Sequence, residues 1–232
     1  MKTIHISKVG LIKLISYKPL CYNKIGLNAI NTYQYPPFVD HSCRREPDFQ
    51  NQLPTITSLC RSGKFAPFLK VDDIVIVITK QSHHLVAILQ VIQVFQNHQQ
   101  GYNWYLNNNL TIPGNCMIQG NPPLDFDRTA GDFINKTQEN AFLKRPNPIQ
   151  LKIGSKRLPI WDNLYIQRAN NHQNFVSTKA LYLDINNPKC IKQGLLSIFS
   201  KTPGTQNNKK LSLDQLEKIG KLVDINFSME II

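Results

Sequence analysis

The sequence predicts an α+β protein whose core is a small, bent, antiparallel β-barrel with flanking helices. Two long runs of aliphatic and β-branched residues, 70–79 and 84–95, are separated by four residues. Their spacing predicts a hairpin of two adjacent strands. A third run of this kind, residues 11–17, precedes them. Long strands joined by a tight connection are typical of a barrel or a strongly bent sheet.

The second long run is apolar on both of its faces. In a straight strand, Val86, Ile88 and Val94 share one face, and Leu85 and its alternating neighbours take the other. A strand with two apolar faces is expected at the centre of a sheet. The first long run begins with Lys-Val-Asp-Asp at residues 70–73, which predicts a polar turn leading into a buried strand.

The segment between the first strand and the hairpin is irregular. Residues 20–53 are rich in Tyr, Asn and Pro, and long irregular segments are usually functional or disordered. The aromatic residues favour the functional alternative. After the hairpin we expect a short helix within residues 97–110. Weaker signals predict a helix at 133–144 and short strands or turns at 152–157, 158–168 and 175–184.

The C-terminal part of the chain carries the clearest helix signal. Ser212 and Gln215 have the spacing of a capping box, and Leu216 and Ile219 follow at helical spacing. This helix is expected to pack on the barrel, with a partner-binding role as the alternative. We therefore divide the chain into a barrel domain, residues 1–150, and an extension, residues 151–232, that packs on the barrel and ends in the helix.

The charge balance favours an anionic partner. The chain carries 27 Lys and Arg against 15 Asp and Glu, which gives a net charge of +12. Only 18% of the residues are charged, so the excess reflects missing acids rather than many bases. Such a field attracts polyanions and favours phosphate contacts. The basic balance predicts nucleic acid or a nucleotide as the partner, although many basic proteins bind neither.

The sequence predicts a cytoplasmic protein without a membrane partner. No apolar run approaches the roughly 18 residues of a membrane-spanning helix. The N-terminal segment is interrupted by Lys8, Lys13 and Lys18 and has no small-residue cleavage site. Five scattered cysteines fit reduced thiols better than a disulfide framework.

Motif searches argue against metals and common cofactors. No Cys-x-x-Cys or His-x-x-x-His pair is present, so we expect no metal ion. No Walker or dinucleotide-binding glycine motif is present either, so no such cofactor is expected. The Gly-x-Ser-x-Gly elbow is also missing, although a catalytic triad assembled only by folding remains open.

Residues 33–64 combine basic, polar and aromatic side chains more densely than any other segment. The candidate phosphate-binding residues are Arg44, Arg45, Arg61 and Lys64. The candidate residues for reading a base edge are Asp48, Thr57 and Ser58. The aromatic candidates for stacking on a base are Tyr33, Tyr35, Phe38 and, outside the segment, Trp104. The alternative interpretation is ordinary surface charge and core aromatics.

The order of these motifs resembles a known family. Between residues 9 and 125 the chain has a strand, an irregular aromatic segment, Ser58-Leu-Cys-Arg61, the 70–73 turn and the return strand LVAILQVIQVF. This order resembles the second type of nucleotide-modification-associated domain, within the PUA-like group that includes EVE, ASCH and YTH domains. The group has a Lys-x-Gly-Asp turn, whereas this chain has Asp72 at the glycine position.

The resemblance implies a pocket for a single, often modified, nucleobase. It implies Ser58, Cys60 and Arg61 at the pocket rim, and Lys70 and Asp73 as turn residues. Members of the family are associated with DNA or RNA modification and phage defence, and a nuclease or modification enzyme is the protein partner that fits this setting. The base would be flipped or single-stranded, would stack on an aromatic ring and would be read along its edge.

Two alternative functions remain open. Some ASCH-like proteins resemble small hydrolases of modified nucleosides that use Lys, Thr and Glu. In this chain Lys64 or Lys18, with Thr57 and Glu46, are the matching residue types. A structural or interaction protein that uses the C-terminal helix is the third class. We expect a binding module rather than an enzyme.

Overall fold

The computed structural model describes most of the chain outside two central segments. The described residues are 2–22, 26–27, 30–31, 34–40, 46–57, 69–118, 120–121, 149–153, 156–160, 167, 169–170, 174–201, 203 and 209–229. The predicted helix at 133–144 lies outside them. No helix within the described ranges is long and apolar enough to cross a membrane.

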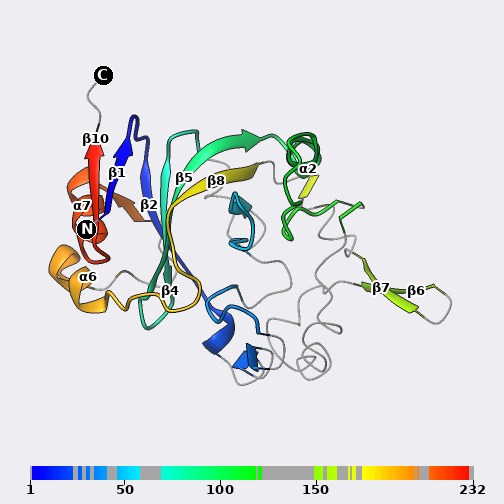
Figure 1. The fold of residues 1–232 in the computed structure, drawn as a ribbon, viewed down its shortest axis with the longest axis horizontal. Coiled ribbons are helices and arrows are strands. Elements are labelled where there is room, and N and C mark those ends of the chain that lie inside the picture. Colours follow the sequence, from blue (N-terminus) through cyan, green and yellow to red (C-terminus); the bar gives the residue numbers. More distant parts are fainter. Residues whose placement is uncertain are drawn as a thin grey trace.

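A six-stranded sheet, curled into a half-barrel, organises the molecule (Figure 1). Its strands, in spatial order, are β3 (Thr55–Thr57), β8 (Phe175–Leu183), β5 (Leu85–Phe95), β4 (Ile74–Thr79), β2 (Ile12–Tyr17) and β9 (Lys209–Leu211). Two small sheets add β1 (Lys2–Ile6) with β10 (Ile225–Met229), and β6 (Ile149–Ile153) with β7 (Lys156–Ile160). The helical elements are η1 (Leu20–Tyr22), α2 (His98–Asn107), α6 (Lys192–Phe199) and α7 (Leu213–Lys221). The α+β class is confirmed.

The predicted hairpin is confirmed, and bulges in it help to bend the sheet. Strands β4 and β5 pair antiparallel, with Ile76 opposite Ile88. The register then shifts, so that Ile78 faces Leu85 and Val86 is the extra residue. A bulge of this kind bends and twists its strand. Val86 and Ile88 consequently lie in different hydrophobic clusters rather than on the one face predicted for a straight strand.

The predicted all-antiparallel sheet is wrong at one pair of strands. Strand β2 runs parallel to β4, with Leu14 opposite Ile76, so the sheet is mixed. A parallel pair requires a long crossover connection. Residues 18–73 connect the two strands. The long irregular segment is part of this connection. The sheet is also a half-barrel rather than a closed barrel.

The sheet crosses the expected domain boundary at residue 150. Strand β8 comes from the predicted extension but lies between β5 and β3 in the sheet. The expected terminal helix is α7, whose capping box between Ser212 and Gln215 is present. The prediction that the extension ends in this helix is wrong, because β10 follows α7 and pairs in parallel with β1.

The two faces of the sheet are covered by different parts of the chain. Ile74 and Ile76 pack with Leu216 and Ile219 of α7, on the side that also holds α6, β1 and β10 (Figure 1). Val75 and Val77 alternate with these residues and pack on the other side against residues that include Phe49. Helix α7 therefore packs on one face of the sheet.

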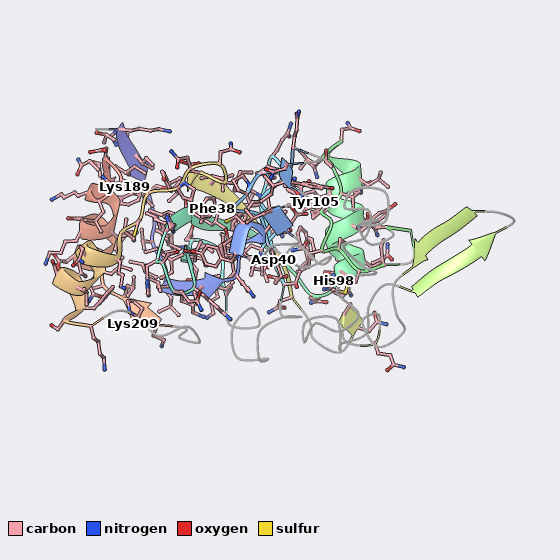
Figure 2. All side chains as sticks on the ribbon, turned by 90° about the horizontal axis from the view of Figure 1, so that it is seen from below. Phe38, Asp40, His98, Tyr105, Lys189 and Lys209 are labelled. Atoms are coloured by element: carbon pink, nitrogen blue, oxygen red, sulfur yellow. The ribbon has the colours of Figure 1, made fainter. Side chains whose placement is uncertain are left out.

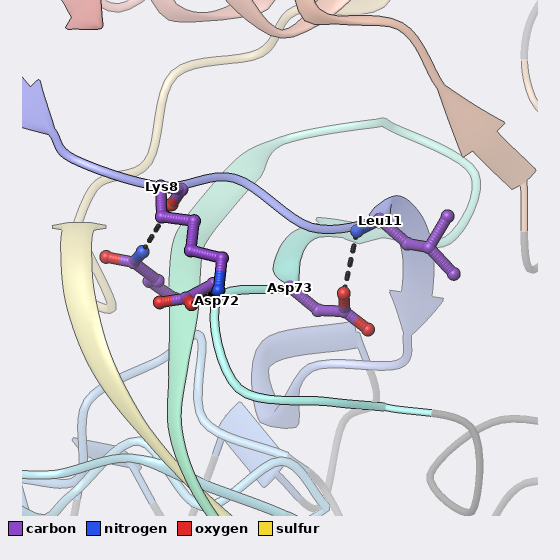
Figure 3. Close-up of polar contacts among 5 residues, drawn as sticks. Lys8, Leu11, Asp72 and Asp73 are labelled. Atoms are coloured by element: carbon purple, nitrogen blue, oxygen red, sulfur yellow. Dashed lines mark hydrogen bonds and ion pairs between the residues drawn. The ribbon is translucent and has the colours of Figure 1, made fainter. Parts of the chain in front are cut away.

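The 70–73 turn is held by a buried carboxylate. Asp73, 2% exposed, accepts a hydrogen bond from the Leu11 N–H at 2.7 Å (Figure 3). It also accepts one from the Lys70 N–H at 3.0 Å. Asp72 has a φ of 73° and forms an ion pair with Lys8 at 3.6 Å. This φ lies in the left-handed region that favours glycine. The turn therefore fixes the start of β2 and β4 together.

Candidate functional site

Strand β3 lies next to β8 at one edge of the sheet and is preceded by a tight loop. Thr55 of β3 pairs with Ser177 of β8. The main chains of Asp48 and Thr55 exchange two hydrogen bonds of 3.0 Å, which closes the loop between them. Tyr105 of α2 holds the loop from the side, because its hydroxyl donates to the Leu53 carbonyl at 2.9 Å.

A group of buried polar residues surrounds this strand, and we call it the β3 carboxylate cluster. Its members are Asp40, Glu46, Asp48, Thr55, Thr57 and Asn115. All six are at most 4% exposed. Burial of a carboxylate is costly unless hydrogen bonds compensate for the lost water.

Glu46 receives hydrogen bonds from two neighbouring segments. Its Oε1 accepts the Thr57 N–H at 2.9 Å, and its Oε2 accepts the Thr57 hydroxyl at 2.5 Å. Asn115 donates its amide to the same Oε2 at 3.5 Å. The Glu46 N–H in turn donates to Asp40 at 3.1 Å. These contacts fix the carboxylate against β3.

Asp48 organises the loop and its neighbour. Its Oδ2 accepts the Gly114 N–H at 2.6 Å and the Asn51 amide at 2.8 Å, and its Oδ1 accepts the Gln50 N–H at 3.1 Å. Asp48 therefore joins the loop before β3 to the loop at residues 113–115.

Within the predicted binding segment, residues 33–64, the cluster brings Glu46 and Thr57 together. Arg45 immediately precedes Glu46 in the sequence, and Ser58 immediately follows Thr57. Glu46 and Thr57 are joined by two hydrogen bonds. These two positions of the 33–64 segment, 11 residues apart in the chain, therefore lie side by side.

The predicted site residues divide into three groups. Asp48 and Thr57 belong to the cluster, where their side chains bond to the protein itself. Trp104 is half-buried on α2, with its ring 5.5 Å from Phe95 and 5.2 Å from Tyr105, and Tyr35 is half-buried in the loop before the cluster. Phe38 is also half-buried, with its ring 5.3 Å from that of His84. The remaining predicted residues lie outside the described part of the chain: Tyr33, Arg44, Arg45, Ser58, Cys60, Arg61 and Lys64.

Sequence reasoning missed Asn115, which bonds to both Glu46 and β3. Its Oδ1 accepts the Thr55 hydroxyl at 2.7 Å, and its amide donates to the Thr55 carbonyl at 3.3 Å. Sixty residues separate this pair in the chain. The Pro113-Gly114-Asn115 sequence indicates a turn, but no local pattern indicates its distant partner.

The ionisable groups beside the cluster are buried and neutral at pH 7. Burial lowers the pKa of His98 on α2 to about 4 and raises the pKa of the Cys116 thiol to about 12. It also raises the pKa of the Tyr105 phenol above its ordinary value. Cys116 is therefore a poor nucleophile. Figure 2 shows His98 and Tyr105 at the α2 end of the sheet, with Lys189 at the opposite end.

A second polar group lies in the turn between β4 and β5. Ser82 Oγ is 2.8 Å from His84 Nδ1 and 3.2 Å from Thr79 Oγ1, and it also contacts the Tyr22 hydroxyl. Folding thus brings a serine next to a histidine, as a catalytic pair requires. The Ser82 oxygen is shared among three partners that hold the turn. A structural role accounts for these contacts.

The described residues contain no group of three His, Cys, Asp or Glu side chains that could hold a metal ion. Comparison of the sequence with protein-family models, with curated proteins and with solved structures gave no match. The resemblance to the PUA-like group therefore stays a prediction, based on the motifs and their order.

Proposed function

We propose that this protein is a binding module that recognises a nucleobase, in particular a modified one, in nucleic acid or a nucleotide. The observation that carries the proposal is the pair of hydrogen bonds between Glu46 and Thr57. They join two positions of the 33–64 segment, whose sequence contains Arg44, Arg45 and Arg61. Arginine is well suited to phosphate because its planar group forms two parallel hydrogen bonds.

Two further features support this function. The net charge of +12 favours a polyanionic partner. The left-handed φ of Asp72 matches the glycine of the Lys-x-Gly-Asp turn in the PUA-like group. A setting in nucleic-acid modification or phage defence, with a nuclease or a modification enzyme as partner, belongs to the same proposal.

Loss of Arg61 should weaken binding without unfolding the protein. An Arg61→Ala variant is expected to lose at least about tenfold in affinity for a nucleic acid, or roughly 1.4 kcal/mol. Its melting temperature should stay near that of the wild type. Fluorescence anisotropy with DNA and RNA oligonucleotides that carry unmodified or modified bases would measure the affinity. Wild-type affinity in the folded variant would assign Arg61 to the ordinary surface.

Hydrolysis of modified nucleosides is the second candidate function. It is favoured by one contact, because the Thr57 hydroxyl lies 2.5 Å from the Glu46 carboxylate. A carboxylate at this distance can take the proton of a hydroxyl or of a water molecule in the same place. Lys18 and Lys64 are the candidates for the lysine that such hydrolases use together with a threonine and a glutamate. Both catalytic candidates are at most 3% exposed, which favours binding over catalysis.

Turnover separates the two functions. The protein is incubated with a panel of modified nucleosides, and products are measured by mass spectrometry. A binding module gives no product. Product that disappears in Glu46→Gln, while that variant remains folded, would establish the hydrolase instead. Thr57→Ser is the matched control, because it keeps the hydroxyl and should keep any turnover.

A further inference from the structure

A hollow of about 400 Å³ lies where α6 begins and α7 ends. It is far from the β3 carboxylate cluster along the sheet, at the end of the molecule marked by Lys189 (Figure 2). Its volume falls within the range of small-molecule sites in proteins, about 300–1,000 Å³. Ile191 and Leu222 contribute apolar surface to its lining.

Three lysines line this hollow, and all three are exposed. Lys189 and Lys192 flank the start of α6, and Lys221 is the last residue of α7. None of the three forms an ion pair with another described residue. The described lining contains no carboxylate. Three positive charges on the lining of one hollow attract an anion.

The backbone around the hollow is held in place by hydrogen bonds and close packing. The Ile191 N–H donates to the His83 carbonyl at 3.0 Å, and the Lys189 carbonyl accepts the Leu85 N–H at 2.9 Å. Gly194 lets α6 approach α7, since a Cβ there would lie 2.4 Å from Leu222. The lysines therefore extend from a fixed frame rather than from an isolated loop.

The first turn of α6 adds backbone N–H groups, which also favour an anion. Its N-cap residue is Ile191, which makes no side-chain capping bond. Free N–H groups at a helix start favour an anion. These N–H groups add to the attraction that the three lysine ammonium groups exert on an anion in the hollow.

We propose that this hollow, the α6–α7 pocket, binds a phosphate group between Lys189, Lys192 and Lys221. Ammonium groups bind phosphate as mobile point charges. The phosphate can belong to a free small molecule or to a nucleic-acid backbone. In both cases the same three lysines neutralise it. This site is separate from the proposed nucleobase site and does not depend on it.

Inorganic phosphate is the first probe, because it has no base. Binding is measured by titration calorimetry and by protection of the Cys190 thiol, which lines the hollow, from alkylation. The modified peptide is quantified by mass spectrometry. Lys192→Gln and Lys221→Gln should each weaken phosphate binding about tenfold, which corresponds to roughly 1.4 kcal/mol. Lys218→Gln is the matched control, because Lys218 lies on the same helix and pairs with Asp214 at 2.9 Å.

The outcomes distinguish a specific phosphate site from attraction by the overall positive charge of the protein. Equal phosphate affinity in the Lys192→Gln, Lys221→Gln and wild-type proteins overturns the proposal, as does an equal loss in Lys218→Gln. A single-stranded oligothymidylate, used in parallel, identifies the source of the phosphate. A larger loss for the oligonucleotide than for inorganic phosphate assigns the pocket to a nucleic-acid backbone, and the reverse assigns it to a free phosphate compound. Arg61→Ala should bind inorganic phosphate as the wild type does, even where it has lost nucleobase binding. The two proposals can therefore fail separately.

Discussion

Asp73 shows how one side chain can fix two strands at once. Its two carboxylate oxygens accept N–H groups from Leu11, just before β2, and from Lys70, at the start of the turn into β4. These strands are neighbours in the sheet, although Leu11 and Asp73 are 62 positions apart in the sequence. The sequence predicted Asp73 as a turn residue but not its bond to Leu11.

Removal of the Asp73 carboxylate should destabilise the protein strongly. Asp73→Ala leaves two backbone N–H groups without their charged acceptor, and we expect a loss of about 3 kcal/mol in the free energy of unfolding. Urea denaturation followed by circular dichroism measures it. Asp72→Asn is the control, because it removes only the exposed pair with Lys8 and keeps a residue that tolerates the left-handed conformation. It should cost less than about 1 kcal/mol. Equal losses would argue against a special role for Asp73.

His98 should make the stability depend on pH. Its Nδ1 accepts the Met117 N–H at 3.0 Å, and burial lowers its pKa from the ordinary 6.5 to about 4. The unfolded chain therefore binds a proton below pH 6.5 that the folded protein does not bind until about pH 4. The contribution to stability is complete above pH 6.5 and is lost as the pH falls from 6.5 towards 4, by about 3 kcal/mol in all.

A His98→Asn variant tests this dependence. Asparagine keeps an acceptor oxygen for the Met117 N–H but does not titrate. The slope of unfolding free energy against pH between 4 and 6.5 should therefore fall by the equivalent of one proton, while the carboxylates contribute equally to both proteins. Identical slopes in the variant and the wild type would show that His98 titrates normally in the folded state.

At the scale of elements, local signals were sufficient where the contacts are local. The β4–β5 hairpin was predicted from its apolar runs, and α7 from helical spacing and from the capping box at Ser212. The parallel pairing of β2 with β4 was not predicted, since a strand pattern does not say which neighbour it pairs with or in which direction. The bonds of Asn115 to β3 were missed for the same reason.

Helix α2 depends on a glycine for its contact with β8. A Cβ at Gly101 would lie 2.4 Å from Cδ1 of Phe175, a fully buried side chain. Gly101→Ala should therefore lower the stability by about 1–2 kcal/mol, although alanine favours helices by nearly 1 kcal/mol. Asn103→Ala, on the exposed side of α2, should leave the stability unchanged or raise it. Thermal unfolding of both variants measures the difference. A more stable Gly101→Ala protein would mean that the helix can move away from β8.

At the scale of the whole molecule, the net charge can be predicted from the sequence, whereas the topology of the sheet cannot. The net charge of +12 is visible in the sequence and supports a polyanionic partner. The extent of the sheet was not visible, because β8 joins it from beyond the expected boundary at residue 150. The net charge follows from the composition and is the same in any fold, whereas strand order depends on contacts between distant parts of the chain.

The affinity for nucleic acid should fall steeply with salt. Each phosphate neutralised by the protein releases counterions, so the logarithm of the binding constant should fall by nearly one unit per phosphate for each tenfold rise in salt. Anisotropy titrations at several salt concentrations give the slope. Lys192→Gln should reduce that slope by about one if the α6–α7 pocket contacts the backbone. Absence of binding to DNA, RNA and their modified forms at low salt would contradict the proposed function.

The position of β8 also sets an order of assembly during synthesis. Among the described strands, β3 is joined to the large sheet only through β8, which is made more than a hundred residues later. The β4–β5 hairpin can form as soon as residue 95 has left the ribosome, whereas β3 must wait for residue 183. A nascent chain released at residue 170 should therefore contain the hairpin but lack the edge on which the β3 carboxylate cluster is built. The protein would acquire its candidate binding site late, close to the completion of its sheet.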